Sequence, residues 1–136
     1  MAAVRQPRRA HPGFPRRGEI YLTTLDPTIG REIKKTRPAL IIQNDISNEH
    51  GGTTIVAPIT STVRTPLSPV HVLLSADPRT GLSVPSVALL NQIRTVDRRR
   101  LVKLLGAIDA PTMEQADEAI AVSLGLAAFL ADRGGE

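Results

Sequence analysis

The chain has 136 residues and no cysteine, so it fits one compact domain and can form neither a disulfide bond nor a thiolate metal site. Its formal net charge is +4, but residues 1–17 contain five arginines and no acidic residue, whereas the remaining 119 residues contain 12 basic and 13 acidic ones. Affinity for phosphate must therefore come from local clusters or from the N-terminal segment, because the body of the protein is close to neutral.

The first 16 residues are rich in arginine and proline and have almost nothing to bury. We expect them to form a basic, flexible tail. They contain no apolar stretch like that of a signal peptide, and no apolar run elsewhere reaches the length of a membrane span. These observations predict a cytoplasmic protein that does not bind a membrane.

From residue 19 onward the chain contains short apolar runs rich in β-branched residues, bounded by Gly, Pro, Asn, Asp or Ser. They predict strands within residues 19–25, 38–43, 53–60, 69–74, 85–90 and 101–108. In the fourth run Val70, Val72 and Leu74 alternate with other residues, which predicts that one face points to the core. The runs at 39–42 and 88–91 are apolar on both faces, so we expect them to lie centrally.

The last third of the chain changes to a helical period. Pro111 suits the first helical turn, and apolar residues then recur every three or four positions, namely Met113, Ala116, Ile120, Leu124 and Ala127. This pattern predicts a helix over about residues 111–125, continuing toward Leu130 if Gly125 does not end it. Several short strands and one C-terminal helix predict a mainly β fold with α, a small and strongly curved antiparallel sheet or barrel closed by that helix.

No common catalytic signature is present, and the scattered histidines and acids predict no metal site. The segment LDPTIGREIKKTRPALII joins two predicted strands and is too polar for the core. Arg37 lies at its strand entrance, where a salt bridge to a neighbouring carboxylate is as good an explanation as a catalytic or binding role. Pro38 is explained equally well as the rigid start of a strand.

Two further segments combine a strand end with polar residues. Thr60, Ser61 and Thr62 follow an apolar run, and hydroxyls in that position more often satisfy a turn than take part in catalysis. Residues 91–97 follow another buried run, and their amides could read nucleobase edges or pair with the backbone. Asp97 precedes three arginines and is best explained as a helical-turn cap or a local ion pair.

The motifs RGE…LDP…G.E…K.RP, then IT at a strand end, then QIRT.D follow one another along the chain. In order and spacing they resemble the MazF/PemK family of toxin endoribonucleases over about residues 16–126. The resemblance implies an SH3-like (PemK/CcdB-type) antiparallel barrel that forms a homodimer, cuts single-stranded RNA at short sequence motifs and is inhibited by a cognate MazE-like antitoxin. It implies an endoribonuclease domain at 17–127 and a C-terminal tail at 128–136.

In one branch of this family the catalytic pair corresponds to Arg37 and Thr60. A second branch uses an aspartate, an arginine and a histidine at positions that hold Asn91, Leu89 and Arg31 here, so that carboxylate base is missing. The resemblance therefore favours metal-independent and cofactor-independent cleavage by Arg37 and Thr60, with attack by the RNA 2′-hydroxyl to give 2′,3′-cyclic phosphate and 5′-hydroxyl ends. The residues expected to bind RNA are Gly30, Arg31, Glu32, Lys34, Ser61, Asn91 and Gln92.

Two alternatives remain open at the level of sequence. The same barrel family includes poisons of DNA gyrase that have no nuclease activity, and a plain RNA-binding adaptor would bind RNA without cutting it.

Overall fold

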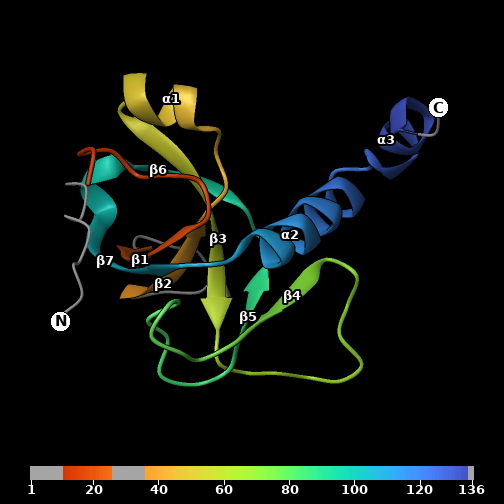
Figure 1. Ribbon diagram of the computed structural model, residues 1–136, viewed down its shortest axis with the longest axis horizontal. Helices are drawn as coiled ribbons and strands as arrows, with labels where there is room; N and C mark the ends of the chain where they lie inside the picture. Colours follow the sequence, from red (N-terminus) through yellow and green to blue (C-terminus); the bar gives the residue numbers. More distant parts are fainter. Residues whose placement is uncertain (1–10, 26–35, 135–136) are drawn as a thin grey trace, which may run out of the picture.

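The computed structural model describes residues 11–25 and 36–134. Within them, seven strands form an antiparallel sheet with the order β4-β5-β3-β2-β1-β7, and β6 pairs with β3 beside this path. The strands are β1 (Glu19–Thr24), β2 (Thr36–Ile41), β3 (Thr53–Thr60), β4 (His71–Leu74), β5 (Ser86–Leu89), β6 (Arg94–Asp97) and β7 (Leu101–Ala107). The helices are α1 (Asp45–His50), the 3₁₀ helix η1 (Arg98–Arg100), α2 (Ala110–Ser123) and α3 (Ala127–Gly134) (Figure 1). The predicted class, mainly β with α, is confirmed.

Strand β3 is the centre of the sheet because it has different partners along its length. One edge pairs with β2 at Val56–Pro58, and the other pairs first with β6, at Thr53–Val56, and then with β5 at Ile59–Thr60. A strand that changes partners in this way bends the sheet on which it lies. The last residues of β3 therefore leave the layer formed by β1, β2 and β6 and join the one formed by β4 and β5 (Figure 1).

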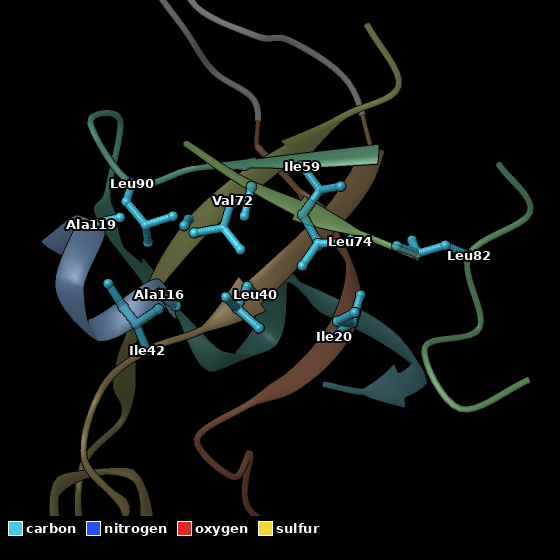
Figure 2. Packing of buried hydrophobic residues seen from close by; sticks show 12 residues of the cluster. Ile20, Leu40, Ile42, Ile59, Val72, Leu74, Leu82, Leu90, Ala116 and Ala119 are labelled. Carbon is cyan, nitrogen blue, oxygen red and sulfur yellow. The ribbon is translucent and has the colours of Figure 1, made fainter. Parts of the chain in front are cut away.

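Both faces of the central strands are buried, as the apolar runs predicted. Leu40 and Ala57 belong to the larger core cluster, whereas their neighbours Ile41 and Val56 belong to a smaller cluster on the other face. The larger cluster is closed by α2 through Ala116 and Ala119 (Figure 2). In β4 the predicted alternation is confirmed, since Val72 and Leu74 are buried and Leu73 is exposed.

The C-terminal helix has the predicted start and an earlier end. Asp109 caps α2 by accepting a hydrogen bond from the Thr112 N–H at 2.9 Å, and Pro111 lies in its first turn. Gly125 has φ +75° just beyond the helix, a conformation that stops it, so the chain continues as the separate helix α3 at the periphery (Figure 1). Part of the predicted C-terminal tail is therefore helical.

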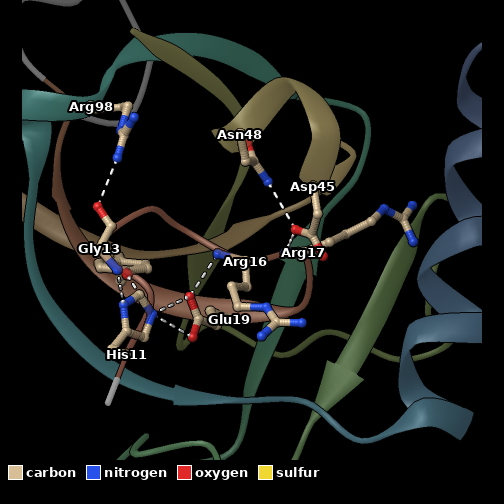
Figure 3. Close-up of polar contacts among 9 residues, drawn as sticks. His11, Gly13, Arg16, Arg17, Glu19, Asp45, Asn48 and Arg98 are labelled. Atoms are coloured by element: carbon tan, nitrogen blue, oxygen red, sulfur yellow. Dashed lines mark hydrogen bonds and ion pairs between the residues drawn. The ribbon is translucent and has the colours of Figure 1, made fainter. Parts of the chain in front are cut away.

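The end of the basic N-terminal segment contacts the sheet. Glu19 accepts hydrogen bonds from the Arg16 N–H at 2.7 Å and pairs with His11 at 2.9 Å, and Arg98 donates to the Gly13 carbonyl at 2.8 Å (Figure 3). Arg17 pairs with Asp117 of α2 at 2.5 Å. These contacts involve residues 11–17, whereas the first ten residues of the predicted tail lie outside the described part of the chain.

Two further elements were not predicted from the sequence. Helix α1 begins after Asn44, whose side chain accepts a hydrogen bond from the Ser47 N–H at 2.8 Å. It is held by the fully buried Asn48, which accepts from the Thr54 hydroxyl at 2.7 Å and donates to the Gln43 carbonyl at 2.9 Å. Strand β6 covers residues that the sequence left as a polar segment after a strand.

Candidate functional site

The predicted catalytic pair lies at the ends of two neighbouring strands. Arg37 is in β2, where it pairs with Thr23 of β1, and Thr60 is the last residue of β3. The register between β2 and β3 ends with the pair Ala39 and Pro58, so Arg37 just precedes and Thr60 just follows the paired residues at the same end of the two strands. Two residues that are far apart in sequence are thus brought to the same end of one strand pair.

Two cavities open beside this strand end, one on each side of it. Side chains alternate in extended chain, so Ile59 and Ser61 line one cavity, whereas Thr60 and Thr62 line the other. The first has a volume of about 310 Å³ and the second of about 410 Å³, at the small end of the range for ligand pockets. The end of β3 is therefore a ridge between two small cavities.

Arg37 lies on the first of these, which we call the arginine cavity. Pro38, Ile59 and Ser61 form one wall, and the loop before β5 forms the other with Gly81, Leu82, Ser83, Val84 and Ser86. That loop approaches β7 closely: the Ala107 N–H donates to the Arg79 carbonyl at 2.8 Å. The wall opposite Arg37 is thus held by backbone contacts with another strand.

Thr60 lies on the second, which we call the threonine cavity. Its hydroxyl oxygen accepts a hydrogen bond from the Thr62 N–H at 3.1 Å, the turn contact expected of a hydroxyl at a strand end. The Thr60 hydroxyl can still donate its proton, because that contact uses only an acceptor position. Thr60 can therefore hold the turn at Thr62 and donate a hydrogen bond to a ligand at the same time.

The structure brings several predicted binding residues into these cavities. Asn91 and Gln92 follow β5 in a turn closed by the Gln92 N–H, which donates to the Leu89 carbonyl at 3.1 Å. Both line the threonine cavity, whereas Ser61 lines the arginine cavity. The other four expected binding residues lie outside the described residues: Gly30, Arg31, Glu32 and Lys34.

The arginines around β6 have structural partners. Arg94 donates to the Leu25 carbonyl at 3.1 Å, and Arg100 donates to the Thr24 carbonyl at 3.3 Å. Asp97 caps η1 and pairs with Arg99 at 3.0 Å, which confirms the predicted cap and ion pair. Hydrogen bonds from Arg99 lower the pKa of Asp97 to about 2, so its carboxylate stays ionised as a cap.

Sequence reasoning missed two contributors to the cavities. His71 lines the threonine cavity beside Arg64, and the loop of residues 81–86 lines the arginine cavity. His71 is opposite Leu89 in the β4–β5 pair, two residues before Asn91, but that register is not visible in the sequence. Its position in β4, alternating with the buried Val72, indicated only that its side chain points away from the core.

No cluster of three potential metal-binding side chains was found in the part of the chain that the structure describes. None of the described helices has the length and apolar character needed to cross a membrane.

The family described as PemK-like, MazF-like toxin of type II toxin-antitoxin system matches residues 16–124. Endoribonuclease EndoA of Bacillus subtilis is 42% identical over 114 residues, which cover 84% of this chain and 97% of that protein.

Solved structures of toxins and endoribonucleases are also similar to this chain. Toxin MazF-mt6 of Mycobacterium tuberculosis superposes with a TM-score of 0.67 at 30% identity, covering 79% of this chain and 97% of that one. An endoribonuclease in complex with its cognate antitoxin, from a mycobacterial species, superposes with a TM-score of 0.67 at 28% identity. The match covers 82% of this chain and 96% of that one. The match of the family begins at residue 16 and ends at residue 124, so α3 lies beyond it.

Proposed function

The chain belongs to the PemK-like, MazF-like toxin family of type II toxin-antitoxin systems, and from this membership we propose that it is a sequence-specific, metal-independent endoribonuclease that cuts single-stranded RNA. The observation that carries the proposal is the position of Arg37 and Thr60 at the same end of the β2–β3 pair, with a small cavity on each side of the end of β3. Residues 17–127 form the nuclease domain in this proposal.

RNA carries its own nucleophile, the 2′-hydroxyl beside the scissile phosphate. An enzyme that works without a metal has to align that oxygen with the phosphorus and stabilise the charge that develops on the phosphate. The guanidinium of Arg37 suits the second task, because its planar donors match two nonbridging oxygens at once. With the phosphate over the ridge of β3, the nucleotides on its two sides occupy the two cavities.

Thr60 has the complementary task of orientation. A threonine hydroxyl is too weakly acidic and too weakly basic to exchange protons efficiently near neutral pH. Since its oxygen already accepts the Thr62 N–H, its own proton is directed to an external acceptor such as the 2′-oxygen or a phosphate oxygen. Loss of one such preorganised donor typically lowers the rate by about 10²- to 10³-fold.

Recognition of the RNA sequence depends on hydrogen bonds in this proposal. The chain has only three aromatic residues, Phe14, Tyr21 and Phe129, and none of them is among the described residues that line either cavity. Base reading then falls to the amides of Asn91 and Gln92 and the hydroxyl of Ser61. The family resemblance adds Gly30, Arg31, Glu32 and Lys34 to that set.

The partners follow from the family and its complexes. We propose that a cognate MazE-like antitoxin inhibits the chain, because a similar endoribonuclease has been solved with its own antitoxin. A homodimer and a cytoplasmic location are proposed on the same family basis.

The test is cleavage of a long RNA by the purified protein in excess EDTA, with the ends of the fragments identified. We expect fragments with 2′,3′-cyclic phosphate and 5′-hydroxyl ends, and no cleavage when the 2′-oxygen at the cut site is removed. Arg37→Ala should abolish cleavage and Arg37→Lys should restore little of it, because lysine cannot bind two oxygens in one plane. Arg99→Ala removes an equally charged but highly exposed arginine from η1 and is the matched control.

Two results would overturn the proposal. RNA that stays whole with the folded wild-type protein would exclude nuclease activity and favour a gyrase poison or an RNA-binding adaptor. Full activity of Arg37→Ala would exclude the assigned site.

A further inference from the structure

His71 lies in the threonine cavity together with Thr60. It is the first residue of β4, pairs with Leu89 in the register with β5, and is partly exposed. The next residue, Val72, points into the core, so the His71 side chain is on the opposite face of the strand, the face on which the cavity opens. The imidazole and the Thr60 hydroxyl therefore line one space of about 410 Å³.

The other described residues that line this cavity cannot accept a proton at neutral pH. Arg64 is a permanent cation, the amides of Asn91 and Gln92 are neutral, and the remaining lining residues are hydroxyl-bearing or apolar. Arg37 is in the neighbouring cavity and is likewise a cation. The proposed reaction needs an acceptor for the proton of the 2′-hydroxyl, and imidazole is the side chain best suited to take up and release a proton in this pH range.

The other two histidines are placed differently. His11 pairs with Glu19 at 2.9 Å near the N-terminal end of the described chain. His50 is at the end of α1 with 74% of its side chain exposed. Neither of them lines either cavity at the end of β3.

We propose that His71 is the general base of the cleavage reaction, an inference that rests on the endoribonuclease function proposed above. The neutral imidazole takes the proton of the 2′-hydroxyl while the 2′-oxygen forms its bond to phosphorus. The bond between phosphorus and the 5′-oxygen breaks, and that oxygen leaves with a proton from solvent water. The imidazolium then returns its proton to water, so the enzyme is regenerated and the products are the cyclic phosphate and the 5′-hydroxyl.

This arrangement divides the work between the two sides of the β3 ridge. Thr60 orients the 2′-oxygen in the same cavity as the imidazole that deprotonates it, and Arg37 stabilises the phosphate charge from the neighbouring cavity. Arg64 adds a positive charge that attracts the RNA backbone to the threonine cavity. The base is supplied by β4, and this arrangement therefore does not need a carboxylate at position 91.

The experiment measures single-turnover cleavage of a short RNA that contains one cut site, by wild-type, His71→Ala and His50→Ala proteins. We expect His71→Ala to cut about 10²- to 10⁴-fold more slowly, as is typical when a general base is lost, and His50→Ala to match the wild type. Imidazole added to the solution should speed His71→Ala in proportion to its concentration and leave wild type and Arg37→Ala unchanged. More basic imidazole derivatives should rescue better than less basic ones.

His71→Asn keeps a polar side chain of similar width but has no basic nitrogen, so it separates loss of the base from loss of folding. Thermal unfolding is measured for each variant. A slow but rescued His71→Ala, together with a slow and folded His71→Asn, supports the proposal. Wild-type cleavage by His71→Ala, or a loss that imidazole does not rescue in a folded variant, overturns it while leaving the nuclease function intact. A wild-type protein that cuts no RNA would overturn the proposed function and this inference together.

Discussion

Substitution of Gly81 by alanine tests how the wall of the arginine cavity is held. Gly81 has φ +72°, and an added Cβ would lie 2.1 Å from the Leu105 carbonyl oxygen and 2.6 Å from its carbonyl carbon. Both atoms belong to the backbone of β7, so a side-chain rotation cannot relieve the overlap. Either the loop or β7 must move by about 1 Å, because carbon and oxygen atoms in contact are normally more than about 3 Å apart.

Gly125 is a matched control for this substitution. Its φ is +75°, nearly the same as that of Gly81, and an added Cβ would meet no atom within 4 Å. The left-handed backbone penalty, about 1–2 kcal/mol, is common to both positions. The overlap adds the cost of overpacking at Gly81 alone, typically about 1–3 kcal/mol, so Gly81→Ala should lower the free energy of unfolding by about 2 kcal/mol more than Gly125→Ala.

Denaturant unfolding of the two variants and of the wild type measures this difference. Because Gly81 lines the arginine cavity, its variant should also cut RNA more slowly than the Gly125 variant under conditions in which both are folded. Equal losses of stability would show that the loop shifts freely and that its contact with β7 does not hold the wall. Slower cleavage without any additional loss of stability would show that the wall moves at little energetic cost.

Two further predictions concern groups outside the cavities. Burial, and then the nearby Glu19 carboxylate, raise the pKa of Tyr21 to about 12. Folding therefore favours the neutral phenol. The stability that Tyr21 contributes in this way is present below about pH 10 and is lost as the pH rises toward 12. Ultraviolet titration follows the single tyrosine of the chain directly: Glu19→Gln should lower the midpoint but keep it above 10, and a wild-type midpoint near 10 would contradict the burial. Asn48→Ala should destabilise the protein by about 2–3 kcal/mol, because it leaves the buried Thr54 hydroxyl without its acceptor and the Gln43 amide with the Thr53 carbonyl alone. Asn44→Ala removes only an exposed cap and should lower the free energy of unfolding by about 1 kcal/mol, so equal effects in chemical denaturation would refute the importance of the buried network.

The strands and the long helix could be predicted because their signals are local. The runs around Leu40 and Ala88 are apolar on both faces and are buried in the sheet, and Pro111 marked the start of α2 within one residue. Helix α1 was missed because six residues are too few to show a helical period, and its stability comes from the buried Asn48. Strand β6 was missed because its residues are mostly polar and show no apolar run. It forms a strand because its backbone pairs with β3, and the sequence does not show that pairing.

The site was only partly predictable because it depends on registers between strands. In isolation Arg37 had an equally good structural explanation and Thr60 a better one, and only the family resemblance joined them before the β2–β3 pairing put them at the same end of two strands. His71 could not be connected with Thr60 in this way, because two pairings intervene: β3 with β5, and β5 with β4. A slip of one residue in either pairing would turn the imidazole to the other face of the sheet. A general base in this position is therefore a property of the assembled sheet, and the buried Val72 and Leu74 maintain it because they keep β4 from slipping.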